Sequence, residues 1–453
     1  MKQGDLVEVE IDDVSSEGSG VARVDQQVVF IPNTVTGDRI SSRILRVKKK
    51  YAQGQLEEFR KNSAYRIRPR CIVADKCGGC QWQHINYLYQ LQLKQNQVKE
   101  TLTRIGGFAD LQVESIISGE DLGYRNKVNY PLGISHTGQI KAGYYRQGSH
   151  QIVNINQCPI QDQRLNPLLA EIKQDLQQLQ IPIYDEKTHK GALRHLCFRI
   201  GKNTGEILLT LVSGELSDDT MDKQAEKWMK RYPNLVGVTL NYNPQKTNVI
   251  FGQKTELLAG RPYLIEQFAG LNYHLRAETF FQVNTTVAED LLTAILNKLS
   301  LTGEETVLDL YCGVGTFTLP FAQKVKKAIG VESYSLSIEQ AQRNAEINNI
   351  DNVEFITETT ETFLPTLETK PDLVILDPPR KGCQTEVIES LKQIKSNFIL
   401  YISCHPATLA RDLQLLCQEG DYRIMFVQPA DFFPQTPHVE TAVILTRISQ
   451  EVH

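Results

Sequence analysis

TVLDLYCGVGTFTLPFA, residues 306–322, is the stretch that decides the fold. Its opening residues form the apolar run of a buried strand, Gly313 and Gly315 lie in a turn, and the residues after them begin a helix. The chain continues in the same way, with further strands predicted at 328–332, 373–377 and 398–403 and helices between them. This alternation predicts a doubly wound, Rossmann-like α/β sheet with parallel strands.

The glycine turn is predicted to bind a nucleoside cofactor. The first βα turn of such a sheet is where these cofactors bind, and Gly313 and Gly315 let backbone amides approach a ligand closely. The spacing Asp309-x3-Gly313-x-Gly315 lacks the third glycine of the dinucleotide fingerprint, which favours S-adenosylmethionine over a nicotinamide dinucleotide. Glu332 ends the next strand, where a carboxylate can accept hydrogen bonds from both ribose hydroxyls.

Two further strand ends carry residues suited to chemistry. Asp377 ends one strand within the run DPPR, whose prolines stiffen the backbone at the strand tip. Cys404 ends the next strand, directly before a helix that opens at His405 and Pro406. The positive end of a helix dipole favours a thiolate, so Cys404 is predicted to be an activated nucleophile. Glu440 lies just before the last predicted strand and is a candidate for the same cleft.

The N-terminal part of the chain has a different pattern. Residues 1–60 form short strands separated by turn residues, which predicts a small, OB-like β-barrel. Residues 39–70 hold eleven Lys and Arg against two Asp and Glu, a local charge of +9 in a chain whose net charge is −4. Such a segment is typical of a surface that docks a polyanion, and equally of a solvated basic loop. The pattern divides the chain into predicted domains at 1–60, 61–265 and 266–453.

Composition excludes several classes of protein. With 453 residues, 41% of them hydrophobic and 23% charged, the chain is neither disordered, collagen-like nor a coiled coil. The first residues carry charges throughout, and no apolar stretch is long enough to cross a bilayer. We therefore expect a soluble, cytoplasmic protein without membrane contact.

A helical pattern at 84–105 ends at Gly106 and Gly107.

Nine cysteines without a secretory signal argue against a disulfide framework. Cys71, Cys77 and Cys80 are clustered, and Cys158 follows far downstream. In a reducing compartment such a set more often binds metal. Four thiolates can hold either zinc or an iron–sulfur cluster, and both remain open at this point.

Three motifs in order resemble one family. DPPRKG (377–382), LYISC (400–404) and DFFPQTPHVE (431–440) resemble the RNA uridine-5-methyltransferase family, and FFQVN (280–284) fits its FQxN segment. The resemblance covers essentially the whole chain, because residues 1–60 resemble the TRAM barrel of the branch that acts on 23S rRNA. This chain departs from the family at His405, where asparagine is usual, and at Thr316, where some members have asparagine.

The resemblance implies an enzyme that methylates carbon 5 of a uridine in RNA. Cys404 would attack carbon 6 of the base, and Glu440 would remove the proton from carbon 5. The target base would flip out of its stack. The residues implied to hold S-adenosylmethionine are Gln282, Tyr311, Gly313, Glu332 and Asp377.

The resemblance also bears on the remaining motifs. It favours a [4Fe-4S] cluster on Cys71, Cys77, Cys80 and Cys158, with a folding or RNA-docking role. It implies that the segment 124–127, YRNK, orients RNA or the active site, the alternative being a structural strand with exposed charges. The expected partner is RNA, with 23S rRNA favoured over tRNA and DNA not expected.

Other functions are weighed against this one. An RNA cytosine-5-methyltransferase usually carries a cysteine at the DPP position, and this chain has none there. An amino-methyltransferase that grips its substrate with DPPR would not need Cys404. A non-catalytic RNA-binding assembly factor would not need a full set of Gly313, Glu332, Asp377, Cys404 and Glu440.

Overall fold

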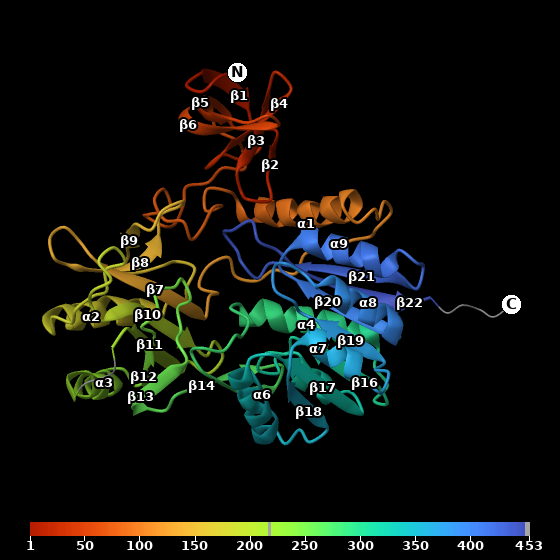
Figure 1. Cartoon of the computed structure of the whole chain (residues 1–453). Helices are drawn as coiled ribbons and strands as arrows, with labels where there is room; N and C mark the ends of the chain where they lie inside the picture. Colours follow the sequence, from red (N-terminus) through yellow and green to blue (C-terminus); the bar gives the residue numbers. More distant parts are fainter. Residues whose placement is uncertain (216–218, 449–453) are drawn as a thin grey trace.

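A computed structural model describes residues 1–215 and 219–448. Residues 216–218 of the predicted second domain and 449–453 of the predicted third lie outside the described part. Figure 1 shows an N-terminal barrel above two larger bodies that lie side by side. Each larger body is built on its own seven-stranded sheet.

The N-terminal sheet has six strands in the order β1-β5-β6-β4-β3-β2. Their bounds are β1 Leu6–Glu10, β2 Asp13–Val14, β3 Gly20–Val24, β4 Gln27–Ile31, β5 Arg39–Val47 and β6 Tyr51–Lys61. Asp25 and Gln26 have positive φ in the two-residue turn between β3 and β4, the conformation that a tight hairpin requires. Alternate residues such as Ala22, Val29 and Ile40 are fully buried and form a small separate core.

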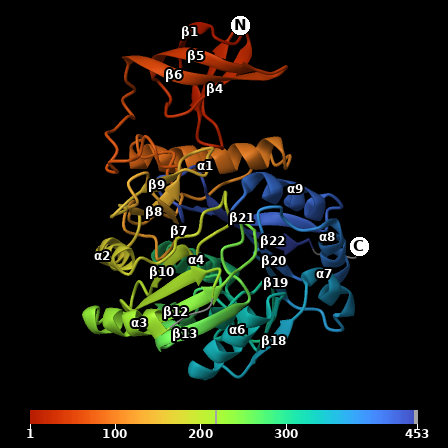
Figure 2. The ribbon, with the colours of Figure 1, turned by 60° about the vertical axis from the view of Figure 1, so that its left-hand side comes forward.

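Helix α1 (Tyr87–Arg104) lies across the top of the C-terminal body, between it and the barrel (Figure 2). The side chain of Asn86 caps its first turn by accepting a hydrogen bond from the backbone of Leu88. Val98 and Leu102 on its buried face join the core of the C-terminal sheet. The helix therefore precedes the central sheet in sequence but packs on the C-terminal body.

The central sheet has the order β13-β12-β11-β10-β7-β8-β9. Its strands are β7 Lys127–Ile134, β8 Ile140–Tyr145, β9 Ile152–Asn154, β10 Leu193–Ile200, β11 Ile207–Ser213, β12 Leu235–Tyr242 and β13 Lys254–Gly260. Helices α2 (Leu165–Gln178) and α3 (Asp219–Arg231) supply buried side chains such as Leu169 and Trp228 to one face of this sheet. A hairpin, β14 (Leu264–Phe268) and β15 (Leu271–Leu275), joins the central part to the C-terminal body.

The C-terminal sheet has the order β18-β17-β16-β19-β20-β22-β21. Its strands are β16 Thr306–Leu310, β17 Lys327–Glu332, β18 Val353–Thr357, β19 Leu373–Leu376, β20 Phe398–Ser403, β21 Tyr422–Ala430 and β22 Glu440–Arg447. The strands from β18 to β20 run parallel, and β22 is antiparallel to both β20 and β21. The predicted Rossmann-like fold is confirmed, with an antiparallel hairpin added at one edge.

Helices pack on both faces of this sheet. They are α4 Thr285–Leu299, α5 Thr318–Ala322, α6 Ser335–Ile347, α7 Thr360–Phe363, the 3-10 turn η1 Leu364–Thr366, α8 Thr385–Ile394 and α9 Pro406–Cys417. The stripe Val287, Leu291, Ile295 and Leu299 of α4 is buried, as its helical spacing predicts. Within the described residues, no helix combines the length and the apolar character needed to cross a membrane.

Candidate active site

The site lies at one edge of the C-terminal sheet. The carboxyl ends of parallel strands meet at a common edge, and ligands bind there where the strand order reverses. In this sheet β16 has β17 on one side and β19 on the other, so the reversal falls beside β16. Five consecutive strands bring predicted residues to this edge. In sheet order these are Glu332 on β17, Tyr311 after β16, Asp377 after β19, Cys404 after β20 and Glu440 on β22.

Strand register sets Cys404 and Glu440 opposite each other. Strands β20 and β22 are antiparallel, and Ser403 pairs with Thr441. One step further in the same register places Cys404 across from Glu440. The two residues are far apart in the chain, yet the sheet brings both to the same strand tip.

A cavity of about 660 Å³ opens at this edge. All the predicted catalytic and cofactor residues line it: Gln282, Tyr311, Gly313, Glu332, Asp377, Cys404 and Glu440. Its remaining lining residues are Phe280, Ser333, Ser337, Glu361, Pro378, Pro379, Arg380, Lys381, Gly382, Phe433 and His438. A cavity of this volume holds a ligand of the size of a nucleoside cofactor.

The cavity is strongly acidic. Burial raises the pKa of Asp377 to about 7, and burial together with Asp377 raises the pKa of Glu440 well above its ordinary value. Burial also raises the pKa of Asp309, behind the glycine turn, to about 7, and Asp309 accepts a hydrogen bond from Thr318. Perturbed carboxyl groups gathered in one cavity are typical of a functional site. A cationic ligand would restore the charged forms of these groups.

Cys404 directly precedes the N-cap of helix α9, as predicted, but its other surroundings disfavour the thiolate. Burial, Glu440 and Asp377 raise the pKa of its thiol to about 11. Arg380 opposes them through its charge and a hydrogen bond to the sulfur. Two carboxyl groups and burial therefore outweigh the favourable position before helix α9, and Arg380 is the group that favours the thiolate.

His405 performs locally what an asparagine would do in its place. It is the N-cap of α9, and its Nδ1 accepts a hydrogen bond from the backbone N–H of Thr408 at 3.3 Å. A side-chain acceptor at this position is what stabilises a helix N-terminus. The departure from the family at 405 therefore leaves the helix that follows Cys404 capped.

The glycine turn has the backbone that its residues predict. Gly313 and Gly315 have φ of 56° and 81°, and Tyr311 has φ of 69°, which is rare for a residue with a side chain. A Cβ on Gly315 would lie 3.1 Å from Leu319, so this position is also tightly packed. The Glu332 carboxylate accepts the backbone N–H of Tyr334 at 2.9 Å and lies at the cavity wall.

The YRNK segment binds the backbone around the site. Asn126 donates to the Gln282 carbonyl at 2.9 Å and to Thr285 at 3.0 Å. Tyr124 donates to the Pro434 carbonyl at 3.1 Å, and Lys127 donates to the Ala277 carbonyl at 2.6 Å. These side chains are buried or half-buried, so the segment positions two cavity-lining stretches rather than presenting exposed charges.

Several cavity residues were not predicted as site residues. Arg380 and His438 lie inside motifs that the sequence made visible, and their side chains approach within 3.5 Å of each other. Because they lie close to Asp377 and Glu440 in the sequence, Arg380 and His438 could have been predicted as site residues. Phe280, a 60% exposed aromatic ring at the cavity, was part of the FFQVN run. Glu361 lies in the first turn of the short helix α7 and carried no sequence signal.

The four clustered cysteines come together between the barrel and the central sheet. Burial raises the pKa of Cys80 to about 12 and that of Cys158 to about 11, and charges on the neighbouring cysteine sulfurs add to both effects. Four thiols within electrostatic range are a donor set that suits zinc or an iron–sulfur cluster. Among residues 1–215 and 219–448, no three His, Cys, Asp or Glu side chains are arranged as a ready-made metal site.

Comparison with known proteins agrees with the fold. The sequence profile described as tRNA (Uracil-5-)-methyltransferase matches residues 86–448, and that of the TRAM domain matches residues 1–56. An RNA methyltransferase of Nostoc sp. is 56% identical over 444 residues, which cover 98% of this chain and 96% of that protein. One of Synechocystis sp. is 52% identical over 449 residues, covering 99% and 97%.

A solved structure is similar over nearly the whole length. The tRNA (uracil-54, C5)-methyltransferase of Pyrococcus abyssi, in complex with S-adenosyl-L-homocysteine, superposes with a TM-score of 0.79 at 29% identity, covering 97% of this chain and 100% of that one. The fold and the cavity thus define an S-adenosylmethionine-dependent RNA methyltransferase with an N-terminal TRAM domain. More narrowly, the chain belongs to the tRNA (uracil-5-)-methyltransferase family.

Proposed function

We propose that the protein methylates carbon 5 of a specific uridine in RNA, with Cys404 as nucleophile and Glu440 as base. The observation that carries this proposal is the register that sets Cys404 opposite Glu440 at the wall of the cofactor cavity. A nucleophile and a base on facing strand tips can act on two neighbouring atoms of one flat ring. An amino-methyltransferase has no use for such a pair.

The chemistry follows from the low reactivity of carbon 5. Cys404 Sγ, as thiolate, forms a bond to carbon 6, and the electron pair of the ring double bond moves toward the carbonyl group at carbon 4. Carbon 5 then carries enolate character and can form a bond to a methyl group. Glu440, as carboxylate, removes the proton from carbon 5. The double bond re-forms, and Cys404 leaves as thiolate.

Arg380 and the acidic cluster set the protonation states for these steps. Arg380 bonds to the Cys404 sulfur and stabilises its charged form. S-adenosylmethionine supplies a methyl group on a positively charged sulfur. The residues that would hold it are Gln282, Tyr311, Gly313, Glu332 and Asp377, whose acidic members suit a cation. Phe280, exposed at the cavity, offers a surface on which a flipped base can stack.

The favoured target is 23S rRNA, and tRNA is a specific second candidate. The basic segment 39–70 and the four clustered cysteines favour rRNA by resemblance. The Pyrococcus abyssi relative, which acts on uracil 54 of tRNA, matches 97% of this chain and favours tRNA. Likeness over the whole length therefore does not separate the two. Methylation of a cytosine is disfavoured because the DPP motif lacks a cysteine.

We also propose that each of the three predicted domains has its own role. The barrel at 1–60 docks RNA, the part at 61–265 carries the cysteine cluster, and the part at 266–453 carries the chemistry. Cys71, Cys77, Cys80 and Cys158 would hold a [4Fe-4S] cluster, which would cross-link the segment before α1 to the central sheet. Its role would be in folding or RNA docking, since no cysteine of this set lines the catalytic cavity.

A Cys404→Ala variant tests the proposal. Incubated with tritium-labelled cofactor and unmodified tRNA or 23S rRNA, it should transfer no methyl group, whereas wild type labels one of the two RNAs. Wild-type protein should also form a stable adduct with RNA containing 5-fluorouridine, because fluorine at carbon 5 cannot leave as a proton does. Methylation by Cys404→Ala would exclude the covalent mechanism. Mapping 5-methyluridine in RNA from cells that lack the protein would identify the target.

A further inference from the structure

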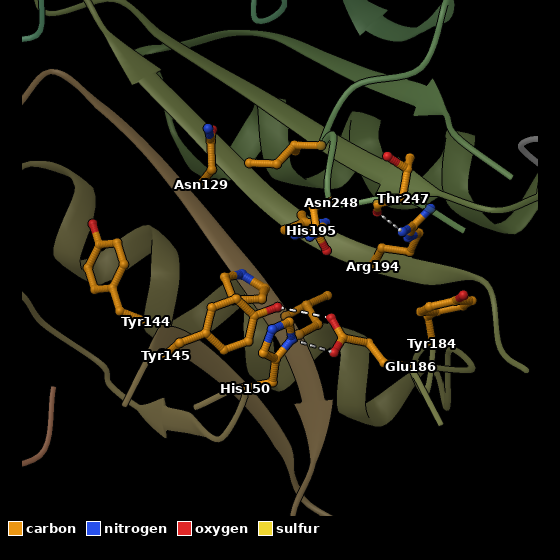
Figure 3. Close-up of a pocket in the computed structure, with 13 residues that line it drawn as sticks. Asn129, Tyr144, Tyr145, His150, Tyr184, Glu186, Arg194, His195, Thr247 and Asn248 are labelled. Carbon is orange, nitrogen blue, oxygen red and sulfur yellow. Dashed lines mark hydrogen bonds and ion pairs between the residues drawn. The ribbon is translucent and has the colours of Figure 1, made fainter. Parts of the chain in front are cut away.

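A second cavity, of about 350 Å³, lies in the central sheet away from the catalytic cavity (Figure 3). Its residues come from strands β7, β8 and β10 and from the loops beside them. Asn129 and His195 lie on one side, and Tyr145 and His150 lie on the other. Its volume falls at the lower end of the range for small-molecule sites, so it suits a group of the size of a nucleobase.

Its walls combine aromatic rings with unsatisfied polar groups. The rings of Tyr145 and His150 have centroids 5.1 Å apart, and both side chains bond to Glu186, at 3.1 and 3.0 Å. The Oδ1 of Asn129 and the Nδ1 of His195 are buried, and neither has a hydrogen-bond partner within the described part of the chain. Both residues line the cavity, and each carries a second polar atom, Nδ2 of Asn129 and Nε2 of His195, with which a ligand can form a hydrogen bond.

His195 is suited to bind a ligand as an uncharged side chain. Burial and the adjacent Arg194 lower its pKa to about 4, so the imidazole is uncharged at neutral pH. A neutral imidazole has one donor and one acceptor nitrogen. Together with the amide of Asn129 and the carboxylate of Glu186, it offers the donors and acceptors that read the edge of a base.

A cationic hollow adjoins this cavity. The hollow, of about 460 Å³, shares Tyr184, Glu186, Arg194, Thr247 and Asn248 with the cavity and adds His189 and Lys246. Arg194 is buried and donates to the carbonyl groups of Asn243, Gln245 and Thr247, and its guanidinium lies 4.7 Å from the Tyr184 ring centroid.

The charges in the hollow suit a phosphate. Carbonyl groups hold the Arg194 cation in place without cancelling its charge. Glu186 opposes Arg194 and Lys246, but it already accepts two hydrogen bonds, from Tyr145 and His150. The cavity can hold a flat base, and the adjoining hollow can hold a phosphate. Together they fit one nucleotide of a longer strand better than a free base.

The cavity lies on the same sheet face as the catalytic segment. Side chains two apart on a strand share a face, so His195, Cys197 and Arg199 of β10 point the same way. Arg199 donates to the carbonyl of Thr279 at 2.6 Å, and the next residue, Phe280, lines the catalytic cavity. The strand from His195 to Arg199 spans about 13 Å, and the catalytic cavity begins beyond Arg199, at Phe280.

We infer that this cavity binds one nucleobase of the RNA substrate, a few nucleotides from the base that enters the catalytic cavity. The neighbouring hollow holds the backbone phosphate next to that base. The inference rests on RNA being the substrate, as proposed above. It adds a position at which the enzyme recognises its target without methylating it.

The test measures RNA binding by the full-length protein without cofactor, so it does not depend on the methyl-transfer mechanism. Tyr184→Ala removes an aromatic ring that lines both the cavity and the hollow, and should weaken binding of the substrate RNA about tenfold, the usual effect of losing one aromatic contact to a nucleotide. Tyr232→Ala is the matched control, since Tyr232 bonds to Glu171 outside the cavity and should leave affinity unchanged. In steady-state assays Tyr184→Ala should raise KM for RNA and leave kcat unchanged.

Because cavity variants can disturb folding, a second measurement uses altered RNA. Abasic nucleotides are introduced one at a time into the substrate. One position should weaken binding to wild type and have no further effect on Tyr184→Ala. The inference is overturned if no abasic position behaves this way. It is also overturned if AMP or UMP alone binds tightly and Tyr184→Ala abolishes that binding while RNA affinity is unaltered, which would mark a site for a free nucleotide.

Discussion

Lys94 and Asp431 form a fully buried ion pair, with Nζ 2.5 Å from Oδ1 and no side-chain exposure on either residue. Lys94 lies on α1, and Asp431 begins the run that ends at Glu440. Lys94 also donates to the carbonyl of Phe433 at 3.0 Å, and Phe433 lines the catalytic cavity. The pair therefore attaches the loop that carries the base to a helix from the other end of the chain.

Removing one member of this pair should destabilise the protein strongly. Lys94→Met leaves the buried Asp431 carboxylate without its cation, which costs about 3–5 kcal/mol. Chemical denaturation would measure the loss in the free energy of unfolding. The double variant Lys94→Met/Asp431→Leu removes both charges and should lose much less. Equal losses in the single and double variants would contradict a pairing role.

Replacing the base should trap the enzyme on its substrate. In Glu440→Gln the amide cannot accept the carbon-5 proton, so Cys404 cannot leave after methylation. A covalent complex with ordinary uridine RNA should then accumulate and persist in denaturing gel electrophoresis. Turnover should fall by about 100-fold or more, the usual contribution of a positioned base. The absence of a complex, with turnover retained, would assign the base to another residue.

The rate should depend on pH through the Cys404 thiol. Because its pKa is raised to about 11, the thiolate fraction increases about tenfold for each pH unit in the neutral range. We therefore expect kcat/KM to rise with pH. Arg380→Gln removes the group that lowers this pKa and should move the profile to higher pH, and Arg380→Lys should restore part of the shift. Superimposable profiles would show that Arg380 does not act on the thiol.

The cysteine cluster should bind iron under anaerobic conditions. Protein purified without oxygen is expected to contain iron and sulfide and to show visible charge-transfer absorption. Cys80→Ser should lose this iron, whereas Cys417→Ser, at the end of α9, should retain it. Loss of iron should reduce thermal stability or RNA affinity more than kcat. Stoichiometric zinc in colourless protein would contradict the assignment.

RNA affinity should depend on salt through the basic segment of the barrel. Lys48, Lys49 and Lys50 are exposed in the turn between β5 and β6. Replacing all three with alanine should reduce the slope of log affinity against log salt by about 2, because each single-strand phosphate contact contributes about 0.7. The matched control replaces Lys223, Lys227 and Lys230, exposed on α3, and should leave the slope unchanged. Equal slopes in the wild type and in both triple variants would contradict a role of the basic segment in RNA docking.

The local sequence pattern was sufficient to predict the strands that build the site. The strand predicted at the opening of the stretch 306–322 is Thr306–Leu310 in the structure, and the one predicted at 398–403 is Phe398–Ser403, because apolar runs between turn residues define buried parallel strands. Several strands were not predicted, among them β6, β18 and β21 and, in the central part, β7, β8, β9 and β13. Strand β18 is only partly buried at the sheet edge, and β6 carries a glycine and many polar residues, so partners distant in sequence determine both.

The sequence did not predict features that depend on charged residues far away in the chain. The raised pKa of Cys404 comes from burial and from carboxyl groups 27 and 36 positions away in the numbering, at Asp377 and Glu440. The sequence showed only the neighbouring helix, which acts in the opposite direction. The partnership of Lys94 with Asp431 has no local signal, because a lysine on an amphipathic helix is ordinarily exposed.

The link between Lys94 and the loop before Glu440 also orders events during protein synthesis. The two partners are 337 positions apart, and a ribosome needs roughly 15–70 s to add that many residues. During this interval α1 has no C-terminal sheet to pack on, and its lysine has no counter-ion. A nascent chain therefore cannot assemble its base opposite its nucleophile, so catalytic competence arrives only when the last strands are complete.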